Sequence, residues 1–153
     1  MTHDVFSLGV GIYIVFRVVQ PTIPLLFLVV WLAFATNELL DVLGHVKRGG
    51  MPVRSFWTHS VITAPLWGVA ASLVSAYLLD KLLGQGMTIS QALFVGGLGI
   101  VFACSHLLLD ALTEGGVYLG RRRLALAHMR YDNPILNGIF TALGVLMVFA
   151  TFV

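Results

Sequence analysis

The sequence predicts an all-α integral membrane protein, a bundle of about five transmembrane helices that forms a single domain over residues 1–153. Composition is the first observation: 58% of the residues are hydrophobic, 10% are charged, and the mean hydropathy is +0.93. These values lie outside the range of soluble globular domains, so lipid is expected to surround most of the chain. The second observation is a series of apolar stretches close to the roughly 20 residues that cross a bilayer.

Five apolar stretches are expected to span the membrane, at residues 5–19, 22–45, 59–80, 87–112 and 134–152. Turn-forming residues separate them. Glycine, proline and charged residues predict polar turns at 46–57 and 84–86, and a basic loop is expected at 117–133. Thr58 or Ser60 is expected to cap the third helix. These connections leave no length for a separate soluble domain.

Lysine and arginine are distributed unevenly between the two ends of this bundle, which predicts its orientation. Cytoplasmic loops of membrane proteins carry the excess of these residues. With five spans, the end that holds the N-terminus also carries Lys47, Arg48, Arg54, Arg121, Arg122, Arg123 and Arg130. The opposite end carries Arg17 and Lys81. We therefore expect a multi-pass protein of the cell (plasma) membrane, with the N-terminus in the cytoplasm and the C-terminus outside.

Three smaller features of the sequence concern a signal peptide, disulfide bonds and nucleic-acid binding. The N-terminus lacks a charged segment followed by a small-residue cleavage site, so the first apolar stretch is expected to be a retained helix. Cys104 is the only cysteine, so an intramolecular disulfide is excluded. Its thiol is expected to pack among apolar side chains and to have no chemical role. The net charge of +2 gives no reason to expect nucleic acid as a partner.

Ionisable residues gather at the end of the bundle that is expected to be cytoplasmic. All five histidines fall there: His3, His45, His59, His106 and His128. Six of the seven carboxylates do the same: Asp4, Glu38, Asp41, Asp110, Glu114 and Asp132. Such groups at the edge of the hydrocarbon are costly unless they pair, bind a ligand or face water. Their segregation therefore predicts a functional site.

Helical spacing predicts that this site binds a metal. Asn37, Asp41 and His45 follow one another at intervals of four residues and share a helix face, and His106 and Asp110 form another such pair. Donors from several helices could surround an ion, and the expected ligands are His3, Asp41, His45, His59, His106 and Asp110. This nitrogen and oxygen set suits a divalent metal, zinc above all, with manganese or iron as alternatives. Six donors exceed one tetrahedral site, so two ions are possible, or one carboxylate acts as general base.

Each of these residues also has a simpler interpretation. A single histidine at a helix end usually lies at the level of the lipid headgroups without binding a metal. The run Arg121-Arg122-Arg123 is more typical of a topology signal than of a substrate clamp. Thr58 and Ser60 are more typical of helix caps than of catalytic hydroxyls. The metal site is favoured because the separate signals point to one end of the bundle.

Several short motifs together resemble a known family. They are Thr2-His3, Phe6-Ser7-Leu8-Gly9, Asn37-x-x-x-Asp41-x-x-Gly44-His45, Arg54 with Thr58-His59-Ser60, His106-x-x-x-Asp110-x-x-Thr113-x-x-Gly116-Val117, and Tyr131-Asp132-Asn133-Pro134. In this order they resemble the YdjM-like family of inner-membrane metal-dependent hydrolases, and look closest to its archaeal branch of unknown function. The resemblance covers nearly the whole chain. Bacterial members carry Asp-x-Asp-His where this chain has residues 41–45, so one acidic ligand is either absent or supplied by Glu38.

The resemblance implies an enzyme with its site at the cytoplasmic leaflet, a metal-dependent phosphatase or phospholipase acting on a phosphoester of a lipid or lipid-linked molecule. Asp41 and Asp110 are the expected catalytic carboxylates. Residues expected to bind substrate or orient the ligands are Asn37, Arg54, Ser60, Thr113 and Asn133, with Arg54 the expected phosphate contact. The alternative is a non-enzymatic scaffold stabilised by a metal, or a small transporter. A transporter is disfavoured because the opposite halves of the helices are almost purely apolar. Oligomerisation is left open.

Overall fold

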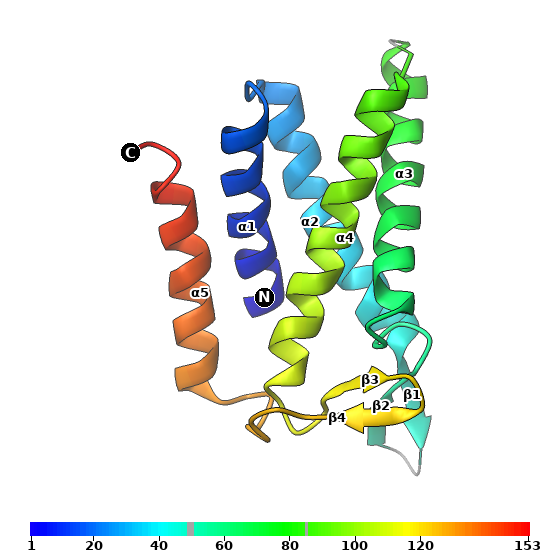
Figure 1. Ribbon diagram of the computed structural model, residues 1–153, viewed down its shortest axis with the longest axis vertical. Helices are drawn as coiled ribbons and strands as arrows, with labels where there is room; N and C mark the ends of the chain where they lie inside the picture. The colour runs from blue at the N-terminus through cyan, green and yellow to red at the C-terminus, as the bar shows by residue number, and fades with distance from the viewer. Residues whose placement is uncertain (49–50, 85) are drawn as a thin grey trace.

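The computed structural model describes residues 1–48, 51–84 and 86–153, and it is mostly helical, as predicted. The described residues form five helices: α1 (Thr2–Val18), α2 (Ile23–Gly44), α3 (Thr63–Leu83), α4 (Ile89–Ala111) and α5 (Pro134–Phe149). Figure 1 shows them side by side with roughly parallel axes. The chain therefore passes up and down the molecule in sequence order.

Two short β-hairpins correct the expectation of a purely helical chain. Strands β1 (His45–Arg48) and β2 (Met51–Arg54) pair antiparallel after α2, and β3 (Val117–Leu119) pairs with β4 (Arg122–Leu124) after α4. Both fall where polar loops were predicted. Pairing satisfies backbone donors and acceptors that a loop would leave to solvent. Gly49, Gly50 and Gln85 of the predicted turns lie outside the described residues.

Local sequence signals define where several helices begin. The Thr22 hydroxyl accepts a hydrogen bond from the Leu25 amide at the start of α2, and Thr88 forms a capping box with Gln91 at the start of α4. The Asn133 side chain caps α5 just before Pro134. The third helix was predicted to begin at residue 59 with Thr58 or Ser60 as its cap, but α3 begins at Thr63 after Ile62, because residues 55–62 are held in a loop by contacts described below.

The N-terminus and both hairpins lie at the same end of the helices (Figure 1). α4 packs against α1, α2 and α3, whereas α5 packs against α1. Glycines permit two of these contacts: a Cβ on Gly9 would overlap the backbone of Gly144, and a Cβ on Gly68 would overlap the backbone of Gly99. Close backbone approach through small residues is typical of helices that associate in lipid.

Two helices, α2 and α4, are long and apolar enough to cross a membrane, judged by length and composition. α5 is apolar but shorter. The main hydrophobic core lies among the helices and contains Leu32, Leu98 and Phe102, which are buried. Many large apolar side chains on the outer faces are exposed, including Phe27, Trp31, Leu93 and Phe149. The interior is thus packed while the outer surface of the bundle is also apolar.

Candidate metal centre

Five ionisable side chains from four segments meet at the hairpin end of the helices. His106 and Asp110 lie one turn apart near the end of α4, and Asp41 lies near the end of α2. His59 comes from the loop 55–62, and His3 from the first turn of α1. Residues far apart in the sequence are therefore brought together because α1 begins where α2 and α4 end (Figure 1).

Backbone hydrogen bonds hold the loop 55–62 against α2 and β3. The Ser55 amide donates to the Gly44 carbonyl at 2.7 Å, and the Tyr118 amide donates to the His59 carbonyl at 2.8 Å. Gly44 has a second role, because a Cβ at this position would overlap the side chains of Thr58 and His59. The glycine at the end of α2 therefore lets the His59 imidazole reach the cluster.

Four side-chain atoms converge at the centre of the cluster. His59 Nε2 lies 3.3 Å from Asp110 Oδ2, and His106 Nε2 lies 3.4 Å from the same oxygen. Asp41 Oδ1 lies 3.4 Å from His106 Nε2 and 3.7 Å from His59 Nε2. Metal–ligand distances of about 2.0–2.2 Å in a tetrahedral site place neighbouring ligands roughly 3.3–3.6 Å apart. Three of the four separations therefore fit the edges of a tetrahedral metal site, and the separation between Asp41 and His59 is slightly longer.

Three of these four atoms are buried without a hydrogen-bond partner among the residues that the structure describes: His59 Nε2, His106 Nε2 and Asp110 Oδ2. Buried polar atoms are normally satisfied, because leaving one unpaired costs about 1–3 kcal/mol. Three such atoms facing one point fit a bound cation. The residues present thus fit the divalent metal that the sequence predicts.

The imidazoles are oriented by contacts through their other nitrogens. His106 Nδ1 donates to the Asn37 Oδ1 oxygen at 3.0 Å, which leaves Nε2 as the nitrogen with a free lone pair. His59 Nδ1 lies 2.8 Å from the Thr58 hydroxyl, which in turn lies 3.2 Å from the Ser55 hydroxyl. Burial lowers the pKa of His59 below its usual value and favours the neutral form, which is the form that binds a metal.

Asp110 uses its two oxygens differently. Oδ1 accepts from Arg54 Nη2 and lies 3.1 Å from His3 Nε2, while Oδ2 faces His59 and His106. Arg54 also donates through Nη1 to the Thr113 hydroxyl at 2.8 Å and to the Gly116 carbonyl at 3.3 Å. The expectation that Arg54 binds a phosphate does not fit this arrangement. Its guanidinium instead fixes Asp110 against the loop that follows α4.

Among the residues that the structure describes, two groups of three have donor atoms close enough to share an ion: His3, His106 and Asp110 form one, and Asp41, His59 and His106 form the other. His106 belongs to both, and its Nδ1 is already bonded to Asn37. One imidazole nitrogen can coordinate one ion, so the two groups describe overlapping parts of one site. His3 is placed to orient the Asp110 carboxylate through Oδ1.

Other predicted site residues lie outside this centre. His45 borders it, with its ring centroid 5.5 Å from that of His59, but its Nδ1 atom lies 2.9 Å from the Asp41 carbonyl and its side chain is exposed. Glu38 is exposed. Ser60 is buried, and its hydroxyl accepts a hydrogen bond from the Ile62 amide. Asn133 caps α5.

The basic run lies on the β3–β4 hairpin, where Arg121, Arg122 and Arg123 are exposed and Arg123 donates to the Glu114 carbonyl. Sequence reasoning missed the role of two glycines. Gly44 makes room for His59, and a Cβ on Gly115 would overlap the Arg54 guanidinium. Their positions next to candidate ligands are a signal, because a glycine there allows close approach of a second chain segment.

A family model described as "Protein of unknown function (DUF1286)" matches residues 1–109, and the chain belongs to this family. The matched region includes His3, Asp41, His59 and His106, and it ends one residue before Asp110. No curated protein and no solved structure matches the chain.

Proposed function

We propose that this DUF1286 protein is a membrane-embedded, metal-dependent hydrolase whose site lies at the cytoplasmic leaflet and acts on a phosphoester of a lipid or lipid-linked molecule. The observation that carries the proposal is the convergence of three buried, unpartnered donor atoms from His59, His106 and Asp110 beside the Asp41 carboxylate. The resemblance to YdjM-like hydrolases stays a prediction that agrees with this site. Zinc is the proposed ion, with manganese or iron as alternatives.

A multi-pass arrangement of about five helices is part of the proposal. α2 and α4 support it by length and composition, and exposed apolar side chains such as Phe27, Leu93 and Phe149 support it for the outer surface. Seven of the nine lysines and arginines belong to the hairpin end, which supports a cytoplasmic location for that end and the N-terminus, with the C-terminus outside.

The chemistry divides between buried and exposed groups. A bound divalent metal would lower the pKa of a water molecule and stabilise negative charge on a substrate oxygen. His59, His106 and Asp110 have 0–1% exposed side chains and would hold the ion, whereas the Asp41 side chain is 42% exposed. Asp41 is therefore placed either to complete the ligand set or to accept a proton from water. Arg54 and His3 would fix the orientation of Asp110.

A purely structural metal site is the second candidate. The observation that favours it is the buried contact between Arg54 and Asp110, which already ties α4 to the hairpin β1–β2. A structural site is closed on all sides by protein ligands, whereas a catalytic site keeps one open position. The exposure of Asp41 favours the catalytic interpretation.

The test is metal analysis of the detergent-purified protein together with assays of phosphatase and phospholipase activity. Asp110→Asn keeps the shape of the side chain but removes the charge that the ion requires. It should abolish metal loading and turnover while the protein still inserts. Cys104→Ala is the matched control, because Cys104 is exposed on the same helix. If the wild-type protein contains no metal, and Asp110→Asn changes neither activity nor thermal stability, the hydrolase proposal is rejected and only the helical bundle remains.

A further inference from the structure

Among the clustered side chains of the candidate metal centre, that of Asp41 is the most exposed. His59, His106 and Asp110 are buried, whereas the Asp41 side chain is 42% exposed. Because the His3 side chain is 26% exposed, the widest approach for a reactant lies past Asp41, near the end of α2.

Asp41 shares its helix face with a stripe of aromatic residues. Seven residues separate Phe34 from Asp41, and at about 100° per residue this is about 20° short of two full turns. Phe27 and Trp31 lie on the same stripe, further from the site. Glu38, which is exposed, marks the position where the stripe changes from apolar to acidic. The stripe thus leads from an apolar surface to the open side of the site.

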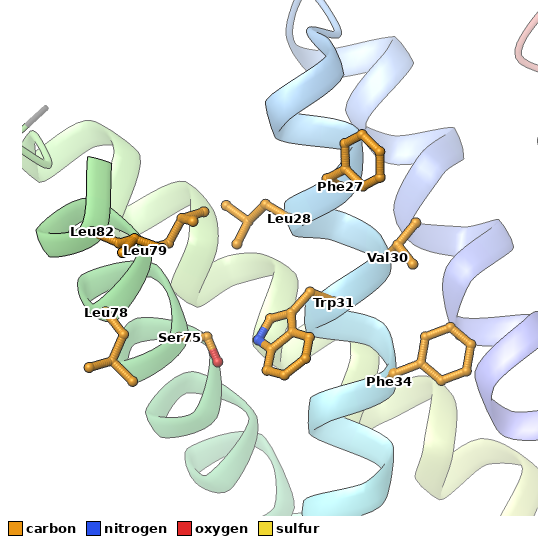
Figure 2. A pocket seen from close by; sticks show the side chains of 9 residues that line it. All are labelled: Phe27, Leu28, Val30, Trp31, Phe34, Ser75, Leu78, Leu79 and Leu82. Atoms are coloured by element: carbon orange, nitrogen blue, oxygen red, sulfur yellow. The ribbon is translucent and has the colours of Figure 1, made fainter. Parts of the chain in front are cut away.

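A groove of about 690 Å³ lies along this stripe between α2 and α3. Figure 2 shows Phe27, Trp31 and Phe34 projecting from α2, with Leu78 and Leu82 on the facing α3. The lining is apolar except for the Ser75 hydroxyl and the indole N–H of Trp31. The volume falls in the range of about 300–1,000 Å³ that small-molecule sites occupy. A lining of this kind selects hydrocarbon and offers almost nothing to a polar ligand.

The length of the stripe sets the size of a matching ligand. Fourteen residues separate Phe27 from Asp41, which is about 21 Å along a helix that rises about 1.5 Å per residue. Carbon–carbon bonds of about 1.5 Å in an extended chain advance roughly 1.25 Å each, so the fifteen bonds of a sixteen-carbon chain cover about 19 Å. A single chain of that length reaches from the far end of the groove to the Asp41 carboxylate.

We propose that the groove between α2 and α3 holds the hydrocarbon tail of a single-chain phosphoester, with the headgroup at the Asp41 side of the metal centre. The headgroup chemistry rests on the proposed function, whereas the tail site rests on the groove itself. Substrate enters sideways along α2, and the distance between Phe27 and Asp41 selects for long chains. A short water-soluble phosphoester lacks the apolar contacts and binds weakly.

The probe for the test is hexadecyl phosphate that carries a photoreactive diazirine at the chain end, added to the full-length protein in phosphatidylcholine nanodiscs. Mass spectrometry of the cross-linked peptides should place the label around Phe27 and on the facing part of α3. Ser75→Phe fills the groove and should reduce this labelling at least about tenfold, the effect of losing contacts to roughly two methylenes. Val74→Phe is the matched control, because Val74 is exposed beside the groove but does not line it, and it should label like wild type.

Competition with unlabelled phosphoesters identifies the ligand that occupies the groove. Unlabelled hexadecyl phosphate should remove the label from the groove, and butyl phosphate should not. Val30→Phe fills the groove from α2 and replaces Ser75→Phe if that variant does not fold. Labelling that spreads over all helices, labelling unaffected by both filling variants, or cross-links between two copies of the chain would each overturn the tail site. Metal content and turnover are measured separately, so groove labelling in a metal-free, inactive protein refutes the proposed function and leaves the tail site standing.

Discussion

Asn37 and His106, 69 residues apart in the sequence, form a buried hydrogen bond of 3.0 Å between α2 and α4. This contact assigns the proton of His106 to Nδ1 and points Nε2 at Asp41 and Asp110. Asn37 therefore orients the His106 nitrogen that the proposed metal would bind. The contact also joins the two helices that are long and apolar enough to cross a membrane.

Asn37→Leu should lower the affinity for zinc roughly 10–100-fold, because loss of the hydrogen bond leaves the His106 tautomer and ring orientation unfixed. Asn37→Asp retains an oxygen acceptor of the same shape and should restore much of the affinity. The measurement is zinc affinity by competition with a chelating dye. Thr36→Val changes the buried neighbouring residue as a control. Equal affinities in wild type and Asn37→Leu would remove Asn37 from the metal centre.

Arg54→Ala should destabilise the protein by about 3–5 kcal/mol, because it leaves the Asp110 carboxylate, with 1% of its side chain exposed, without its cationic partner. Arg54→Lys should recover only part of this loss, since an ammonium group cannot contact Asp110 and Thr113 with the fork of a guanidinium. Denaturant unfolding in detergent measures both. If Arg54 instead bound the phosphate of a substrate, Arg54→Ala would leave the free energy of unfolding unchanged and reduce the affinity for substrate.

His59 and His45, which both lie near Asp41, should behave differently when removed. His59→Ala deletes a buried donor and should weaken metal binding more than the roughly 10–100-fold expected for a residue that only orients a ligand. His45→Ala should change the affinity less than about tenfold, because His45 is exposed and faces a backbone carbonyl. Metal titration of both variants distinguishes the cases. Equal losses would place His45 among the ligands, as the sequence predicted.

Gly68→Ala should destabilise the protein by about 1–3 kcal/mol, because the new methyl group overlaps the backbone of Gly99 and forces α3 and α4 apart. Gly97→Ala is the matched control on α4, where a Cβ meets open space. It should leave stability unchanged or raise it by up to about 1 kcal/mol through helix propensity. Thermal unfolding in detergent compares them. Identical shifts would show that the α3–α4 contact is loose.

The proposed orientation can be tested by cysteine labelling in a Cys104→Ala background. Ala127→Cys lies in the exposed segment before α5, at the hairpin end, and Gln20→Cys lies in the exposed connection between α1 and α2. A membrane-impermeant maleimide added to intact cells should label position 20 and spare position 127, because the basic end faces the cytoplasm. Labelling at position 127 alone would show that the protein has the opposite orientation in the membrane.

The helical part of this arrangement was predictable because it depends on local patterns. The pair His106 and Asp110 follows from helical spacing, and the fourth helix was predicted to within a few residues of α4. The loop that carries His59 was not predictable, because its position depends on hydrogen bonds to Gly44 and Tyr118, which are distant in the sequence. Without knowledge of these contacts, the apolar residues after Ser60 predict that the third helix already begins there.

The two hairpins were missed for a related reason. Their basic residues indicated loops, and a strand of three or four residues has no periodicity strong enough to oppose that interpretation. Gly49-Gly50 between two short segments was a hairpin signal in the sequence. Arg54 was assigned to a phosphate because its partner, Asp110, lies 56 residues away and sequence spacing gave no sign of the pairing.

Asp110 is the last residue of the cluster to be synthesised. His3, Asp41, Arg54 and His59 all leave the ribosome before it, and His3 precedes it by 107 residues. Until α4 is complete, these residues lack the partner that neutralises Arg54 and completes the ligand set. α5 packs on α1 afterwards and supplies none of the clustered donors. Assembly of the candidate centre therefore waits for the fourth helix, whereas a chain that ended before α5 would already contain every one of its clustered donors.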